Sequence, residues 1–179
     1  MILVVASSPL ELSGVESLSP PLKDNFKALT VGVGKINATL NTLQAIHRYS
    51  PSLVVAVGSC GAIREELEIG DFIFPNRVVQ WDIDLERFGW SRGALPSASG
   101  EIEGVLELPP LSVDYSSYQG RGVKHSLTLG SGDRFLLRPE REEMGWLIDE
   151  LDLWAVDMES YGVVKASREM GIEVMVGRF

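Results

Sequence analysis

The chain has 179 residues, of which 45% are hydrophobic and 23% charged, so its composition is that of a folded globular domain and excludes a disordered protein. Its formal net charge of −9 argues against a protein that binds nucleic acid by neutralising phosphates. The single cysteine, Cys60, excludes an intrachain disulfide. No apolar run approaches the roughly 20 residues that span a bilayer. Because Met1 leads directly into a short apolar run without a basic segment, no signal peptide is predicted, and we expect a cytoplasmic protein with no membrane partner.

Short apolar runs followed by turn residues recur in the first half of the chain. A continuous β-branched run such as residues 53–57 is typical of a strand buried on both faces. Apolar residues at helical spacing, among them Leu40, Leu43 and Ile46, indicate a helix that Pro51 closes. The pattern predicts strands at residues 2–6, 28–33, 53–57, 71–75 and 77–81, and a helix at residues 37–49.

The second half opens with a long irregular stretch, residues 91–122, that is rich in Ser, Gly and Pro and includes one strand near residues 104–108. Strands are predicted at residues 126–129, 154–158 and 172–176, and helices at residues 138–152 and 160–170, the last closed by Gly171. There is no internal repeat and no linker, so residues 1–179 are predicted to form one domain.

Strands that alternate with helices predict an α/β fold with a mixed central sheet flanked by helices. In such sheets ligands bind at the carboxyl ends of strands. Glycine-rich and acidic segments follow several of the predicted strands, so we expect a binding site at those ends.

Two glycine-rich segments follow predicted strands. Gly32-Val33-Gly34-Lys35 precedes a helix, where backbone N–H groups can hold an anion, but it is neither a P-loop nor a dinucleotide fingerprint, and a tight turn is the favoured interpretation. In Gly58-Ser59-Cys60-Gly61-Ala62 the small residues let the backbone approach a ligand, with a plain strand-ending turn as the alternative. Cys60 has no histidine near it in sequence, so we interpret it as a packing residue rather than a nucleophile.

The segment Asp157-Met158-Glu159 ends a predicted strand. Its two carboxylates point to opposite sides of an extended chain, so one can face a pocket and accept hydrogen bonds from sugar hydroxyls. On this segment alone, an ordinary helix start with Asp157 or Ser160 at the cap is favoured. His47 and His125 lie outside metal-ligand spacing, so we expect neither a metal ion nor a cofactor.

Taken together, the order and spacing of these segments resemble the purine nucleoside phosphorylase/nucleosidase superfamily. The matching segments span essentially the whole chain and comprise residues 31–38, 57–62, 70–71, 130–135 and 156–160, together with Glu11 after Pro9-Leu10. The resemblance implies a mixed-sheet α/β fold of the phosphorylase/hydrolase type. It also implies cleavage of the N-glycosidic bond between ribose and a purine base, through a state in which positive charge develops on the sugar.

The resemblance further implies roles for individual residues. Glu159 would hold the ribose hydroxyls, Met158 would pack against the sugar, and Phe135 would stack on the base. Glu11 would activate the attacking water, supported by Arg178. The complete predicted set comprises Glu11 and Arg178 as catalytic residues and Ser59, Gly61, Phe88, Asp133, Phe135, Met158 and Glu159 as substrate-binding residues.

Whether water or phosphate attacks the sugar depends on cations near the site. Phosphorylases of this superfamily surround phosphate with arginines, one of them at the position where this chain has Ala56, and no arginine precedes Arg48. The resemblance therefore favours hydrolysis, as in nucleosidases that cleave methylthioadenosine and adenosylhomocysteine, or futalosine. A phosphorylase that receives phosphate ligands from a neighbouring subunit is the alternative. Because residues 81–90 resemble a segment that reaches a neighbour's ligand across a dimer, we expect a homodimer or higher homo-oligomer, with Phe88 making that contact.

One feature departs from the family pattern. In the family, the strand matched to residues 172–178 continues into a Ser-Asp pair whose aspartate protonates the leaving purine, and a further helix follows. The sequence ends at Phe179, so we expect that aspartate and that last helix to be missing, with apolar surface uncovered near the last strand. General acid catalysis is worth about 10²–10⁴-fold, so the second hypothesis is a non-catalytic protein that binds a nucleoside or merely packs in an oligomer.

Overall fold

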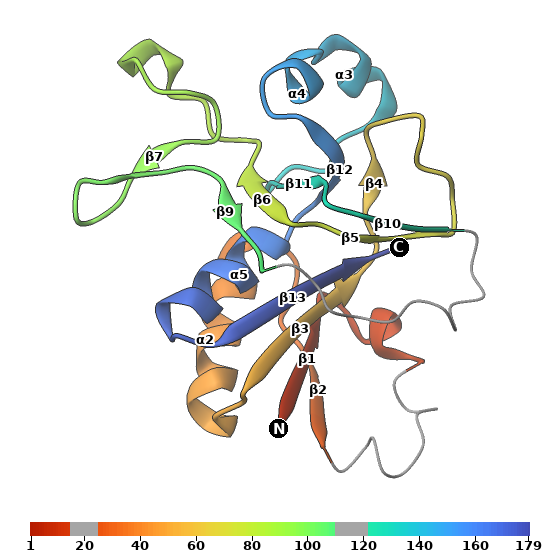
Figure 1. Cartoon of the computed structure of the whole chain (residues 1–179), viewed down its shortest axis with the longest axis vertical. Coiled ribbons are helices and arrows are strands. Elements are labelled where there is room, and N and C mark those ends of the chain that lie inside the picture. Colours follow the sequence, from red (N-terminus) through yellow and green to blue (C-terminus); the bar gives the residue numbers. More distant parts are fainter. Residues whose placement is uncertain (15–24, 110–121) are drawn as a thin grey trace.

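The computed structural model describes residues 1–14, 25–109 and 122–179 (Figure 1). Its larger sheet, sheet A, has six strands in the order β10-β5-β13-β3-β1-β2. Neighbouring strands of sheet A run parallel except for β13 and β5, which are antiparallel. The strands are β1 (Ile2–Ala6), β2 (Phe26–Thr30), β3 (Leu53–Gly58), β5 (Asp71–Phe74), β10 (Gly122–His125) and β13 (Glu173–Arg178).

A second sheet, sheet B, has five strands in the order β4-β12-β11-β6-β9. Its three central strands are parallel, and the outer strands β4 and β9 are antiparallel to their neighbours. The strands are β4 (Gly61–Ala62), β6 (Arg77–Gln80), β9 (Leu106–Glu107), β11 (Thr128–Ser131) and β12 (Leu153–Asp157), and β7 (Leu95–Pro96) pairs with β8 (Ile102–Glu103) in a small separate hairpin. One buried apolar cluster contains residues of both sheets, such as Leu3 and Val54 from sheet A and Leu129 and Ala155 from sheet B.

Two helices pack together beside sheet A (Figure 1). They are α2 (Lys35–Tyr49) and α5 (Ser160–Glu169). They approach closely at Gly162, where an added Cβ would lie 2.5 Å from the Lys35 carbonyl oxygen. Figure 1 shows α3 (Arg138–Glu143) and α4 (Trp146–Asp149) together at the opposite end of the molecule from β2. Two 3₁₀ turns complete the described elements, η1 (Pro9–Leu12) and η3 (Glu86–Phe88).

The predicted mixed α/β fold with flanking helices is confirmed, with its strands distributed over two main sheets. Several predicted bounds are wrong. The strand predicted at residues 28–33 ends at Thr30, because Gly32 turns the chain at a φ of +82°. The helix predicted at residues 138–152 is two short helices separated at Met144 and Gly145.

Two further differences concern burial and the irregular stretch. Strand β3 is not buried on both faces, since only alternate residues such as Val54 and Ala56 are fully buried. The stretch predicted as irregular contains the short strands β7 and β8 as well as β9, which is the strand expected near residues 104–108. Its residues 110–121 lie outside the described residues.

Candidate active site

A cavity of about 440 Å³ opens where strands of both sheets end. The segments lining it follow β1, β2, β3, β11 and β12, which lie in parallel ladders. Parallel strands bring the segments after them to one edge of a sheet, which is where ligands bind in α/β folds. The lining includes the predicted residues Glu11, Ser59, Gly61, Phe135, Met158 and Glu159, and in addition Ser7, Val33, Cys60, Arg134, Leu136, Val156 and Asp157.

Glu11 lies in η1, just after β1, and its carboxylate accepts hydrogen bonds at both oxygens. Oε2 accepts the backbone N–H of Ser7 at 3.0 Å and its hydroxyl at 2.6 Å. Oε1 accepts the backbone N–H of Ser59 at 2.8 Å and its hydroxyl at 3.0 Å. Burial by itself raises the pKa of Glu11, but these hydrogen bonds and the charge of Arg178 outweigh it and hold the pKa below its usual value. Glu11 is therefore ionised at neutral pH, as a general base must be.

Arg178 lies beneath the cavity, buried to 2% exposure, and is not part of the lining. Its Nε and Nη2 atoms lie 2.8 Å and 2.7 Å from Asp157 Oδ2, and both donate to the Ser160 hydroxyl, at 3.2 Å and 2.9 Å. Asp157 also accepts the Ser131 hydroxyl at 2.6 Å and the Ser160 backbone N–H at 3.2 Å. Asp157 is thus the paired carboxylate of the Asp157-Met158-Glu159 segment, and it binds the N–H of Ser160, the first residue of α5.

Arg178 and Glu11 meet at Gly58, the last residue of β3. A Cβ added to Gly58 would lie 2.3 Å from Arg178 Nη1 and 2.7 Å from Glu11 Oε1. The guanidinium is held by Asp157 and Ser160, so it cannot yield easily to a larger residue. Glycine at position 58 therefore makes room for the base and its supporting cation to lie side by side.

Glu159 is the second carboxylate of the cavity. It is 7% exposed, and its Oε1 accepts the backbone N–H of Gly34 at 3.1 Å. Burial and the negative charge of Asp157 raise the pKa of Glu159 above its usual value, and the Gly34 N–H and Arg178 offset this only in part. Gly34 has a φ of +91°, which favours glycine. The glycine-rich segment after β2 is therefore both a turn and an anion-binding segment, and one anion it binds is a side chain of the protein itself.

Asp133 and Phe88 lie outside the cavity lining. Asp133 Oδ1 accepts the backbone N–H of Lys35 at 2.7 Å, and the Asp133 N–H donates to Asp82 Oδ2 at 2.8 Å. Lys35 Nζ in turn pairs with Asp82 Oδ1 at 2.5 Å. The Asp133 carboxylate therefore holds the first residue of α2. Phe88 lies in η3 and is 76% exposed.

Phe135 and Met158 supply apolar surface to the cavity. Phe135 is 75% exposed, whereas Met158 is partly buried. An exposed aromatic ring at the edge of a cavity can stack on a flat, apolar-faced ligand such as a nucleobase.

Sequence reasoning did not single out Ser7 or Asp82 as site residues. The available signal for Ser7 was its place directly after a predicted strand and four residues before Glu11. Asp82 likewise follows a predicted strand. Cys60 lines the cavity, and burial raises the pKa of its thiol to about 11, so the thiol is neutral at physiological pH, which suits packing and not nucleophilic attack.

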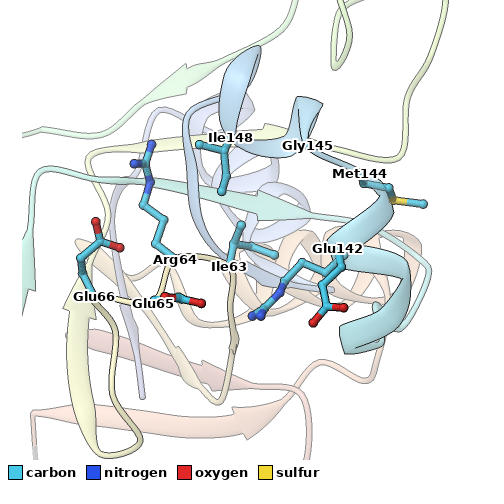
Figure 2. A pocket seen from close by; sticks show the side chains of 9 residues that line it. Ile63, Arg64, Glu65, Glu66, Glu142, Met144, Gly145 and Ile148 are labelled. Carbon is cyan, nitrogen blue, oxygen red and sulfur yellow. The ribbon is translucent and has the colours of Figure 1, made fainter.

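A second cavity, of about 630 Å³, contains none of the predicted site residues (Figure 2). It lies between the segment after β4 and the helices α3 and α4. Figure 2 shows Ile63 and Ile148 pointing toward one another across it, with charged side chains around them. Both of its arginines are engaged within the protein, since Arg64 pairs with Asp152 at 2.5 Å and Arg141 donates to a backbone carbonyl at 2.8 Å. We assign no ligand to this second cavity.

Within the described residues, 1–14, 25–109 and 122–179, no three or more His, Cys, Asp and Glu side chains are grouped so as to hold a metal ion. Over the same part of the chain, no helix combines the length and the hydropathy needed to cross a membrane.

Comparison with known proteins gives consistent matches. The sequence model of the phosphorylase superfamily matches residues 28–178. The 5′-methylthioadenosine/S-adenosylhomocysteine nucleosidase of Actinobacillus succinogenes is 29% identical over 150 residues, which cover 84% of this chain and 64% of the relative. The nucleosidase of the same name from Listeria welshimeri is 27% identical over 154 residues, covering 84% and 65%. The chain thus spans slightly less than two thirds of the length of these curated relatives.

Solved structures with the same fold include two from different bacteria. The futalosine hydrolase of Helicobacter pylori, in a mutant form, superimposes with a TM-score of 0.82 at 23% identity, covering 99% of this chain and 88% of that one. The 5′-methylthioadenosine/S-adenosylhomocysteine nucleosidase of Neisseria meningitidis, in complex with methylthio-immucillin-A, superimposes with a TM-score of 0.83 at 18% identity, covering 98% and 83%. At these identities the likeness establishes the fold.

Proposed function

Because the chain belongs to the phosphorylase superfamily, whose sequence model matches residues 28–178, we propose that it hydrolyses the N-glycosidic bond of a purine nucleoside of the methylthioadenosine or adenosylhomocysteine type. The observation that carries the proposal is the set of side chains that line one cavity. Glu11 and Glu159, two carboxylates in different electrostatic environments, line it together with Met158 and Phe135. This combination suits a ligand with a polar sugar and a flat base.

In the proposed reaction, Glu11 accepts a proton from a water molecule, whose oxygen then attacks C1′ of the ribose. As the bond from C1′ to the base nitrogen breaks, positive charge develops on the sugar, and the electron pair of the bond leaves with the purine, which takes up a proton from solvent. Glu159 accepts hydrogen bonds from the ribose hydroxyls and favours that charge electrostatically. Phe135 stacks on the base, and Met158 packs against the sugar. Arg178 supports Glu11 from beneath the cavity.

Water is favoured over phosphate as the nucleophile because the cavity offers few cations. Arg134 is the arginine of the lining among the described residues, and it is already paired with Glu140. Arg178 is buried against Asp157. Ala56, at the position of a phosphorylase arginine, is a buried residue of β3. A phosphate ion would therefore be poorly compensated within this chain.

Adenine release from methylthioadenosine, measured with and without phosphate, tests the proposal. We expect release that does not depend on phosphate, and futalosine is assayed beside it as the alternative substrate. Glu11→Gln should lower turnover by about 10²-fold or more, the usual worth of a general base, while binding of the nucleoside changes little. Glu65→Gln, at the second cavity, is the matched control.

Three results would contradict this assignment. Phosphate-dependent formation of ribose 1-phosphate would identify a phosphorylase instead. Tight binding of methylthioadenosine without release of adenine would support a non-catalytic binding protein. Unchanged turnover in Glu11→Gln would reject Glu11 as the base.

We also propose that the chain acts as a homodimer or higher homo-oligomer, in which Phe88 reaches the ligand of a neighbouring copy. Phe88 is exposed and lies away from the cavity of its own chain. Val33 and Phe135, at that cavity, are exposed to 53% and 75%, and Ile36, at the start of α2, to 71%. Apolar surface of this kind is typical of a contact between subunits. Sedimentation of a single monomeric species at micromolar concentration would contradict the proposal.

A further inference from the structure

Ser7 is a residue of the cavity to which the proposed function gives no role. It follows β1 directly and lines the cavity. Its hydroxyl donates to Glu11 Oε2 at 2.6 Å, the shortest of the hydrogen bonds that this carboxylate accepts, and its backbone N–H donates to the same oxygen at 3.0 Å. Ser7 therefore holds one oxygen of Glu11, and Ser59 holds the other.

The carboxylate of Glu11 is saturated by these contacts. An ionised carboxylate has about four acceptor sites, two on each oxygen, and here each oxygen accepts one N–H and one O–H. A water molecule can donate to Glu11 only by taking the place of one donor. The two N–H donors are fixed by the backbone, whereas a hydroxyl can rotate away. One of the two serine hydroxyls must therefore yield when water arrives.

The geometry indicates which hydroxyl yields. The Ser59 hydroxyl contacts Oε1 at 3.0 Å, and the Ser7 hydroxyl contacts Oε2 at 2.6 Å, so the Ser59 contact is the longer and weaker one. Oε1 is also the oxygen that lies next to Gly58 and Arg178. If water replaces the Ser59 hydroxyl, Ser7 still holds Oε2, and the proton leaving the water reaches Oε1.

Resting on the proposed function, we propose that Ser7 is a positioning residue for the catalytic base: its hydroxyl fixes Oε2 of Glu11 so that Oε1 receives the proton of the attacking water. Without this contact, a long side chain on a 3₁₀ turn of four residues regains rotamer freedom. Ser7 acts through Glu11 and does not contact the reacting atoms.

The test compares Ser7→Ala with Ser7→Thr, which keeps the hydroxyl, and with Ser8→Ala. Ser8 is the neighbouring serine at the start of η1, and its side chain makes no capping hydrogen bond. In Ser7→Ala we expect kcat to fall about tenfold with KM nearly unchanged, and the acidic limb of the pH profile to move up by roughly one unit, because a hydrogen bond to the charged form is lost. Ser7→Thr should restore both values, and Ser8→Ala should match the parent chain.

A second measurement does not need turnover. The carboxyl carbon of Glu11 is titrated by NMR in the ligand-free parent chain and in the same three variants. The charged groups that act electrostatically on Glu11, Arg178 and Glu159, stay in place in all of them. A higher midpoint in Ser7→Ala alone supports the positioning role. If the parent chain releases no adenine, that separate result counts against the proposed function and not against the positioning role. An unchanged midpoint in folded Ser7→Ala overturns the positioning role.

Discussion

Burial raises the pKa of both carboxylates of the cavity, but their other contacts differ, so the net pKa shifts are opposite. Glu11 receives hydrogen bonds from two serines and the charge of Arg178, so its pKa lies below the usual value. Glu159 receives one N–H and faces the charge of Asp157, so its pKa is raised. Carboxyl groups whose environments separate their pKa values are typical of sites with divided roles. The contrast supports a base at Glu11 and a ligand-holding group at Glu159.

Glu159→Gln should stabilise the free protein while weakening ribose-bearing ligands. Because the folded-state pKa is raised, the ionised form costs stability above the raised value, and this cost disappears once pH falls below the unfolded value of about 4.3. We expect the melting temperature to rise by about 2–4 °C at pH 8, the range that ~1 kcal/mol produces in a chain of this size, and to stay unchanged at pH 3.5.

Calorimetry measures how tightly the same variant, Glu159→Gln, binds its ligands. Losing charge-assisted hydrogen bonds should weaken methylthioadenosine binding by about 10- to 100-fold, whereas free adenine, which has no ribose, should bind as before. Glu173→Gln, an exposed position on β13, is the control. Equal losses for both ligands would remove the ribose role from Glu159.

The sequence predicted these residues better than their surroundings. Glu11, Ser59, Phe135, Met158 and Glu159 stand in recognisable segments and do line one cavity. The contacts made by Gly58 and Asp82 were not predicted, because each depends on a distance between segments that are separate in sequence. For the same reason the sequence did not predict that Asp157 pairs with Arg178, although the family resemblance implied that Glu159 is the carboxylate that holds the ribose. The Ser7 contact was not predicted although Ser7 is only four residues from Glu11.

At the scale of elements, the start of α2 organises the site. The Gly34 N–H donates to Glu159 and the Lys35 N–H donates to Asp133, so two carboxylates lie at the positive end of a 15-residue helix. The Lys35 side chain continues to Asp82, which also accepts the Asp133 N–H. The segments after β2, β6 and β11 are therefore tied together beside the cavity.

Asp82→Asn should loosen this junction. Removing the charge leaves the Lys35 ammonium, whose side chain is 11% exposed, without its partner, and we expect a loss of about 2 kcal/mol in the free energy of unfolding. Urea denaturation measures it. The double variant Lys35→Met/Asp82→Leu should recover part of the loss, because it leaves no unpaired charge. A double variant less stable than Asp82→Asn would show that the ion pair itself, and not the unpaired lysine, dominates.

Helices and strands were predicted correctly where the apolar residues follow a single pattern with clear ends. The prediction failed where a turn divides a segment of uniform composition. Strands β1 and β3 are short apolar runs with clear ends and were predicted within one residue. Residues 138–152 have helical composition throughout, but Gly145 begins a new helix after Met144 leaves helical geometry, so α3 and α4 are separate. Pairing within sheets A and B depends on contacts across the whole chain, which local patterns do not encode.

At the scale of the whole molecule, the Arg178–Asp157 pair joins the two sheets. Arg178 ends β13 of sheet A, and Asp157 ends β12 of sheet B. Their side chains are 2% and 1% exposed. The pair thus lies at the junction of the sheets, with Asp157 in the lining of the cavity and Arg178 behind it.

Arg178→Met should be the most destabilising of the substitutions considered. Breaking a buried ion pair by removing one partner costs about 3–5 kcal/mol, because the remaining charge is buried and unpaired. The midpoint of urea unfolding should fall accordingly. Lys165→Met, which removes a lysine paired at partly exposed Glu103 and Glu169, should cost less than about 1 kcal/mol. Similar losses in the two variants would mean that the junction does not hold the sheets together.

Cys60 gives the cavity a built-in attachment point for a reporter group. It is the single cysteine of the sequence, so an alkylating dye would mark one position without prior mutagenesis. With a pKa of about 11, only about one thiol in a thousand is ionised at pH 8, so labelling should be slow and should accelerate roughly tenfold per pH unit. A nucleoside occupying the cavity would shield the sulfur, and the labelling rate would then read out occupancy directly.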